Sequence, residues 1–222
     1  MLCLLTGQVV ASATAHAGNL LADQLRRTAP QIDHQVLELA VNAMQCATTH
    51  GMSPSQRLAV IDYSLPSTEP RLWVFDLQKR KLLYRELVAH GRNTGENYAR
   101  DFSNIEGSLK SSIGLFRTRE TYNGSNGYSL RMDGLEEGFN DKALERAIVM
   151  HGAPYVSETL ARKQGRVGRS WGCPAVRAGI ARRMIDTLKG GQFLFSYYPD
   201  PRWLASSRYL NCKSTNTIAR SD

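Results

Sequence analysis

Residues 147 to 155 read AIVMHGAPY, and residues 168 to 177 read GRSWGCPAVR. The first stretch is a short apolar run that ends at His151, and Gly152 after it lets another molecule approach the backbone closely. The second stretch sets Cys173 between a glycine and a proline, just ahead of apolar residues at helical spacing. The two stretches therefore predict a strand that ends in a histidine and a helix that begins at a cysteine.

Cys173 has four candidate roles: buried thiol, half of a disulfide, metal ligand or nucleophile. A zinc site needs about four Cys or His ligands, usually in close pairs. The sequence contains no C-x-x-C, H-x-x-H or H-E-x-x-H motif, so we expect no metal. A thiol at a helix N-terminus faces the positive end of the helix dipole, and Arg169 and Arg177 are close in sequence, so we expect a lowered pKa. His151 is then a candidate base for this nucleophile, with a purely structural histidine as the alternative.

The rest of the chain is patterned mostly as strands. Strand candidates lie in residues 71–91 (two strands around a polar QKRK turn), 112–122, 127–134, 147–152 and 192–198. Apolar residues at helical spacing predict helices over 31–48 and from Cys173 to Gly190, and Ser53-Pro54 predicts a short helix through Ile61. The expected fold class is therefore mostly β with helices, with a small α-helical piece at the N-terminus.

Changes in composition divide the chain into four parts. The opening MLCLLTGQVVASATAHAGNL is an apolar stretch that contains the small-x-small pattern Ala15-His16-Ala17, typical of a signal-peptide cleavage site; a buried N-terminal helix is the alternative. LPSTEP at residues 65–70 has the composition of a linker. We expect a signal peptide (1–17), a helical N-terminal segment (18–64), a catalytic domain (71–198) and a C-terminal tail (199–222).

The cysteine count is consistent with export. Removal of residues 1–17 takes Cys3 away and leaves Cys46, Cys173 and Cys212. Three thiols in an exported chain predict one disulfide and one free cysteine. Cys46 and Cys212 flank the domain and could tie its ends together, which would leave Cys173 free.

The formal net charge of +8 indicates an acidic partner. The arginines are scattered and no helix-turn-helix or aromatic-basic RNA-binding signature is present, so we expect no nucleic acid. An anionic cell-wall polymer or membrane surface fits an exported protein better; a charge excess that only keeps the chain solvated is the alternative. No segment approaches the ~18 to 20 unbroken apolar residues of a membrane span, so we expect none in the mature chain.

The two opening stretches together carry a family resemblance. IVMHG followed by GRSWGCPAV resembles the exported L,D-transpeptidases of bacterial cell-wall synthesis, the YkuD-type family. The family signature is a His-Gly after a strand and then a Ser-x-Gly-Cys stretch, which here are His151-Gly152 and Ser170 to Cys173. SSIGLF at residues 111–116 is similar to the family's Thr-Pro-x-Gly-x-Phe strand. The similarity covers about Arg71 to Tyr198, is greatest for a Gram-negative branch, and implies a β-sandwich or barrel-like catalytic domain.

The resemblance implies a reaction without metal or organic cofactor. Cys173 is the nucleophile and His151 its base, the Gly152 carbonyl orients the imidazole, and the amides of Gly172 and Cys173 form the oxyanion hole. The partners are peptidoglycan stem peptides: a thioester forms on the cysteine, and an amine of another stem, or water in a carboxypeptidase reaction, resolves it. The protein is then a periplasmic or cell-envelope enzyme, expected to be a monomer, and a target for acylation by carbapenems.

Some residues depart from the family pattern. Trp171 stands where the family carries a small or imidazole side chain, and Pro174-Ala175 stand where it places an aliphatic residue and an arginine. Arg169 or Arg177 is therefore the candidate for that arginine's substrate-binding role. The other candidates for binding substrate are polar or aromatic residues near the strand ends: Ser170, Trp171, His90 and Asn104.

Two other classes of function stay open at this point. One is a cysteine peptidase or amidase of a different fold that acts on cell-wall peptides; in the papain-like relation the cysteine typically precedes the histidine, opposite to the order here. The other is a non-catalytic wall-binding module in which Cys173 is structural. A free, readily alkylated Cys173 would argue against the module.

Overall fold

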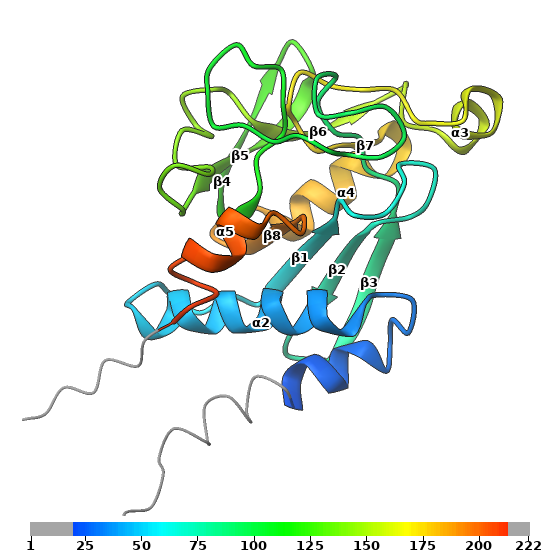
Figure 1. The fold of residues 1–222 in the computed structure, drawn as a ribbon. Helices are drawn as coiled ribbons and strands as arrows, with labels where there is room; N and C mark the ends of the chain where they lie inside the picture. The colour runs from blue at the N-terminus through cyan, green and yellow to red at the C-terminus, as the bar shows by residue number, and fades with distance from the viewer. Residues whose placement is uncertain (1–19, 213–222) are drawn as a thin grey trace, which may run out of the picture.

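The computed structural model describes residues 20–212, which form one sheet with helices on both of its faces (Figure 1). The strands are β1 (Arg57–Asp62), β2 (Leu72–Asp76), β3 (Lys81–Glu86), β4 (Gly114–Gly124), β5 (Gly127–Gly134), β6 (Val149–Ala153), β7 (Ala175–Arg177) and β8 (Phe193–Tyr197). The helices are α2 (His34–Thr49), α3 (Glu158–Gln164), α4 (Ala178–Leu188) and α5 (Pro201–Ser206), and residues 20–26 are helical as well. The expected fold class is confirmed.

The strand order in the sheet is β3-β2-β1-β8-β4-β5-β6-β7. The β1–β8 and β6–β7 pairs are parallel, and the other pairs are antiparallel. β8 is the last strand in the chain, yet it lies in the middle of the sheet between β1 and β4. β6 and β7 form one edge, and this edge carries the residues that the sequence singles out.

The core lies on both faces of the sheet. In β1, Leu58 and Val60 pack into the apolar cluster that contains the buried face of α2 and the indole of Trp203. Ala59 and Ile61 pack into the second cluster, which contains the buried face of α4. Successive side chains of a strand point to opposite faces, so a strand covered on both sides must be apolar throughout.

β1 corrects one sequence expectation. A short helix from Pro54 through Ile61 was expected, but residues 57–62 form a strand that pairs with both β2 and β8. The Ser-Pro capping signal is local, whereas the run LAVID is buried on both faces, and tertiary burial outweighs a helix-start preference worth about 1 kcal/mol. LPSTEP at 65–70 is therefore the connection between two neighbouring strands of one sheet.

α2 and the C-terminal segment cover the same face of the sheet. The side chain of Asp33 caps α2 by accepting a hydrogen bond from the Val36 amide at 3.1 Å. Trp203 of α5 is fully buried in the apolar cluster that also contains the buried face of α2. Cys46 of α2 is joined to Cys212 by a disulfide with a Cα–Cα distance of 5.9 Å. The segment that follows β8 is thus covalently tied to α2 as far as Cys212.

Two expectations concern the ends of the chain. The signal peptide (1–17) and the chain beyond Cys212 lie outside the described residues, and the division into 18–64, 71–198 and 199–222 stays a prediction. Within residues 20–212, none of the helices is both long enough and apolar enough to cross a bilayer.

Candidate active site

The parallel pairing of β6 and β7 brings the histidine and cysteine segments together. His151 lies opposite Ala175 in the register, and Cys173 comes just before β7. The sequence placed Cys173 at the start of a helix, which is wrong: β7 intervenes, and α4 begins only at Ala178. The helix dipole therefore does not act directly on the thiol, because its field falls off within the first turn.

The thiol of Cys173 is buried and held by the backbone of β6 and the residues before it. The side chain is 8% exposed, the Val149 amide donates to Sγ at 3.4 Å, and the thiol donates to the Ala147 carbonyl at 3.5 Å. Burial raises the pKa of Cys173, while the Val149 amide and the Arg146 guanidinium act to lower it. A net lowering of the thiol pKa by a helix dipole, Arg169 and Arg177 was expected. This expectation is wrong, because burial has the largest effect and raises the pKa.

His151 is oriented by its own neighbour. The imidazole is 3% exposed, and Nδ1 lies 3.0 Å from the Gly152 carbonyl oxygen. A carbonyl oxygen only accepts, so Nδ1 carries the proton and Nε2 keeps its lone pair. Burial lowers the pKa of His151, because a buried imidazole resists gaining charge. The ring is therefore a neutral base, although within the described residues no hydrogen bond joins it to Cys173.

The segment before the cysteine is closed by its own hydrogen bonds. The Ser170 hydroxyl donates to the Cys173 carbonyl at 2.6 Å and accepts from the Gly172 amide at 3.1 Å. Gly172 has φ +131°, a backbone conformation that only glycine adopts without strain. The Gly172 amide is thus already used, and of the two expected oxyanion donors only the Cys173 amide is not hydrogen-bonded to another residue within residues 20–212.

The two candidate arginines are each paired with a carboxylate. Arg169 donates to Glu96 at 2.5 Å, and Arg177 binds Glu86 through two hydrogen bonds of 2.7 Å each. Trp171 lies between this pair in sequence and is 73% exposed, so its indole does not pack on the sheet. A substrate-binding role for these residues and for Ser170 stays a prediction.

His90 and Asn104 are used within the fold. His90 is 1% exposed; Nδ1 accepts from Arg71 at 2.7 Å and Nε2 donates to the Gly95 carbonyl at 3.2 Å. Burial, followed by the charge of Arg71, lowers the pKa of His90 to about 4. Asn104 donates to the Asp141 carboxylate at 2.7 Å and accepts from the Lys142 amide at 3.1 Å. Neither ring nitrogen of His90 is free, and its substrate-binding role stays a prediction.

The sequence reading missed Arg146. This residue precedes the strand that carries His151, and its guanidinium binds four acceptors in the segment 103–112. Those acceptors lie 34 to 43 residues before Arg146 in the chain, so no local motif reveals them. The available signal was a basic residue directly before the apolar run.

One group of described residues has the composition of a metal site. Cys46, His50 and Cys212 bring a nitrogen and two sulfur atoms within 4.8 Å of one another. The two sulfurs are joined in the disulfide, so they are not available as thiolate ligands.

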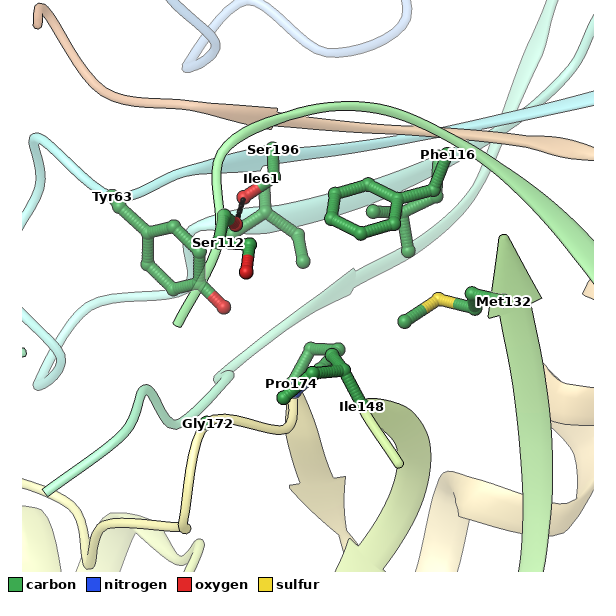
Figure 2. A pocket seen from close by; sticks show the side chains of 10 residues that line it. Ile61, Tyr63, Ser112, Phe116, Met132, Ile148, Gly172, Pro174 and Ser196 are labelled. Carbon is green, nitrogen blue, oxygen red and sulfur yellow. Dashed lines mark hydrogen bonds between the residues drawn. The ribbon is translucent and has the colours of Figure 1, made fainter. Parts of the chain in front are cut away.

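A small cavity lies behind the cysteine segment (Figure 2). Pro174 and Ile148 line it from one side, and Phe116 and Ser112 lie across from them; the Ser196 hydroxyl donates to the Ser112 carbonyl at 3.0 Å. The cavity measures about 10 Å³, and a water molecule needs about 10–15 Å³ on the same measure. This space is therefore too small to hold a substrate.

Comparison with known proteins finds similarity over most of the described residues. A family model described as an L,D-transpeptidase catalytic domain matches residues 28–197. Similar solved structures are an L,D-transpeptidase from Mycobacterium smegmatis (13% identity, TM-score 0.41) and one from Mycobacterium tuberculosis H37Rv (14%, 0.39). Each alignment covers 65% of this chain, and the chain spans 60% and 59% of the length of those structures, respectively. No curated protein sequence matches the chain.

Proposed function

Because this chain belongs to the L,D-transpeptidase catalytic domain family, we propose that it cross-links or anchors peptidoglycan with Cys173 as its nucleophile. One observation supports the proposal above the rest. The thiol that is free among the described residues lies in the same β6–β7 edge as a neutral, oriented imidazole. A nucleophile, a base and a group that orients the base are the parts that acyl transfer through a thioester needs.

In the first half-reaction a stem peptide acylates the enzyme. Nε2 of His151 takes the proton of Cys173, and the thiolate attacks the carbonyl that follows the L-centre of the stem, typically of meso-diaminopimelate. The Cys173 amide donates to the oxyanion, and loss of one such donor typically costs about 100- to 1,000-fold in rate. The imidazolium then gives its proton to the leaving amine of D-alanine. A thioester and free D-alanine result.

In the second half-reaction an amine resolves the thioester. The side-chain amine of another stem attacks the thioester carbonyl and loses a proton to Nε2 of His151. The C–S bond breaks, an amide bond forms, and the proton returns to Cys173. Water in place of the amine gives a carboxylic acid, which is L,D-carboxypeptidase activity. The residues supply proton transfer and charge stabilisation, so no metal or organic cofactor enters the reaction.

The proposal includes export to the cell envelope. The apolar start with its Ala15-His16-Ala17 pattern directs export and is cleaved after Ala17. Residues 71–198 hold the whole reaction site, and β1 supports it from the centre of the sheet. N-terminal sequencing of the protein recovered from the envelope tests this: a chain that starts at Met1 would contradict cleavage.

The test compares the wild type with Cys173→Ala and His151→Ala. Incubation with a carbapenem should add the mass of one drug molecule to the wild type and nothing to Cys173→Ala at any pH. His151→Ala should react slowly at pH 7 and faster as the pH rises: even an ordinary thiol of pKa about 8.5 is only a few per cent thiolate at neutral pH, and burial raises the pKa of Cys173 further. Wild-type acylation rates in His151→Ala at pH 7 would show that the histidine is structural.

Turnover with a tetrapeptide stem separates the proposed function from its rivals. Release of D-alanine together with a new cross-link indicates a transpeptidase, and release without a cross-link indicates a carboxypeptidase. Cleavage at another bond indicates a cell-wall peptidase or amidase. Binding to peptidoglycan without any thiol acylation would identify a non-catalytic module and overturn the proposal.

A further inference from the structure

Arg146 is the one charged side chain among the described residues that lowers the pKa of the Cys173 thiol, and it has no carboxylate partner of its own. Arg169 and Arg177 are paired with Glu96 and Glu86, as described above, whereas no carboxylate lies within ion-pair distance of Arg146 in residues 20–212. Its Nε is buried and has no hydrogen-bond partner there. The positive charge of Arg146 is therefore not neutralised by a carboxylate within the fold. Arg146 directly precedes the segment whose Ala147 and Val149 backbone groups hydrogen-bond the Cys173 thiol.

The guanidinium of Arg146 ties the segment 103–112 into a closed loop, which we call the serine loop. Nη1 donates to the Ser103 carbonyl and to the Ser112 hydroxyl, both at 2.6 Å. Nη2 donates to the Ser108 hydroxyl at 3.1 Å and to the Lys110 carbonyl at 2.7 Å. The four acceptors include both ends of the serine loop and two points between. Only the planar fork of an arginine offers so many donors from one side chain.

The serine loop contacts the segment of the nucleophile. The Ser111 hydroxyl donates to the Gly172 carbonyl at 2.9 Å and accepts from the Gly91 amide at 3.0 Å. A Cβ built on Gly172 would lie 2.8 Å from the Lys110 carbonyl oxygen, which is the same oxygen that Arg146 holds. Any shift of this carbonyl therefore reaches Gly172, and with it the residue that follows.

A second connection from Arg146 to the thiol runs through Ala147. Ala147 has φ +51°, which is uncommon for a residue with a Cβ and costs on the order of 1–3 kcal/mol. Its carbonyl accepts the hydrogen bond of the Cys173 thiol. The anchoring of the Arg146 side chain on the serine loop helps to hold this strained peptide, which in turn positions Sγ.

We propose that Arg146 is a positioning residue for the nucleophile: it fixes the serine loop and Ala147 against Cys173 and places a positive charge beside the thiolate. The inference rests on the proposed function, in which Cys173 must ionise. The other titratable groups that act on this site are neutral near pH 7. Burial raises the pKa of both Tyr63 and Tyr155 to about 12, and His151 is held neutral by burial.

The experiment measures how fast iodoacetamide alkylates Cys173 as a function of pH, read on the Cys173 peptide by mass spectrometry in the full-length protein. Arg146→Gln removes the charge and most of the donors. An opposite charge close to a thiolate lowers its pKa by about one unit or more, so the midpoint of the alkylation profile should rise by about one pH unit and the rate at pH 7 should fall about tenfold.

Two further variants give the experiment its controls. Arg146→Lys keeps the charge but lacks the fork, so its alkylation midpoint should stay nearer the wild type while hydrogen exchange in residues 103–112 becomes faster. Arg117→Gln is the matched control, because Arg117 also has an unpartnered buried nitrogen, but its guanidinium stacks on Phe193. It should leave the alkylation profile unchanged.

The outcomes separate this inference from the proposed function. A folded Arg146→Gln protein with the wild-type alkylation profile would overturn the role of Arg146. Should Arg146→Gln not fold, unchanged exchange of the serine loop in Arg146→Lys would overturn it instead. Alkylation needs no peptidoglycan, so a wild-type protein without turnover counts against the proposed function alone.

Discussion

Removal of the Cys46–Cys212 disulfide should destabilise the protein strongly and leave the reactivity of Cys173 unchanged. The perturbation is the double variant Cys46→Ala/Cys212→Ala, or reduction of the wild type. Cys46 packs in the apolar cluster around α2, and Cys173 is not part of that cluster. The loss should therefore lower the free energy of unfolding without moving the thiol or its hydrogen bonds.

The magnitude follows from the length of chain that the bond closes. The two cysteines are 166 positions apart, and for a loop of this length the chain-entropy model gives about 5 kcal/mol at 25 °C. Measured losses for native disulfides run about 2–5 kcal/mol. At about 2–4 °C per kcal/mol for a domain of this size, the melting temperature should fall by roughly 5–20 °C.

Thermal unfolding followed by circular dichroism, with and without a phosphine reductant, measures the shift. Mass spectrometry after alkylation must show that both thiols are open in the reduced sample. A fall of less than about 2 °C with both thiols open would refute the loop-closure reasoning. A changed rate of Cys173 alkylation in a folded double variant would refute the independence of the two regions.

Three further predictions follow from the fold and the site. Gly172→Ala should lose about 2–6 kcal/mol of stability, because φ +131° does not suit alanine and its Cβ would lie 2.7 Å from Ile148 Cδ1; unchanged thermal unfolding would contradict this. The pKa of His90 is about 4 when folded and about 6.5 when unfolded, so the unfolded chain binds the extra proton and stability falls as the pH drops from about 6.5 to 4, by ~3 kcal/mol. Urea unfolding against pH should show that loss in the wild type, and a folded His90→Gln protein should lose less by about this amount, with the remaining loss in this range coming from His151, whose pKa burial also lowers. Deletion of residues 18–64 should prevent the protein from folding, because it removes β1, which pairs with both β2 and β8. A truncated protein that unfolds cooperatively would contradict this.

Most of the sheet could be predicted because its signals are local. The strands of 71–91, 112–122 and 127–134 each show an apolar run bounded by turn residues, and they became β2 to β5. β1 was missed because a capping signal precedes it and only its pairing with β2 and β8 reveals a strand. β7 was missed because its three residues run directly into α4, and Val176 fits the helical spacing of the residues that follow.

The site could be predicted only as far as its sequence motifs reach. His151 and Cys173 stand in short, recognisable contexts. The surroundings of each side chain could not be predicted from such motifs, because they depend on partners that are distant in the chain. His90 is buried and accepts a hydrogen bond from Arg71, and the positive charge that acts on the thiol comes from Arg146, whose only sequence signal is its place directly before the apolar run.

The central place of β8 has a consequence for how the chain is made. A growing chain can form the unit β3-β2-β1 and the unit β4-β5-β6-β7 early, with single bridges such as Val88–Val176 between them. No strand fills the place between β1 and β4, however, until residues 193–197 arrive and pair with both. Such long-range pairing is slow compared with local contacts. We therefore expect nascent chains that stop before residue 193 to remain protease-sensitive, and the completed chain to lock both halves at once.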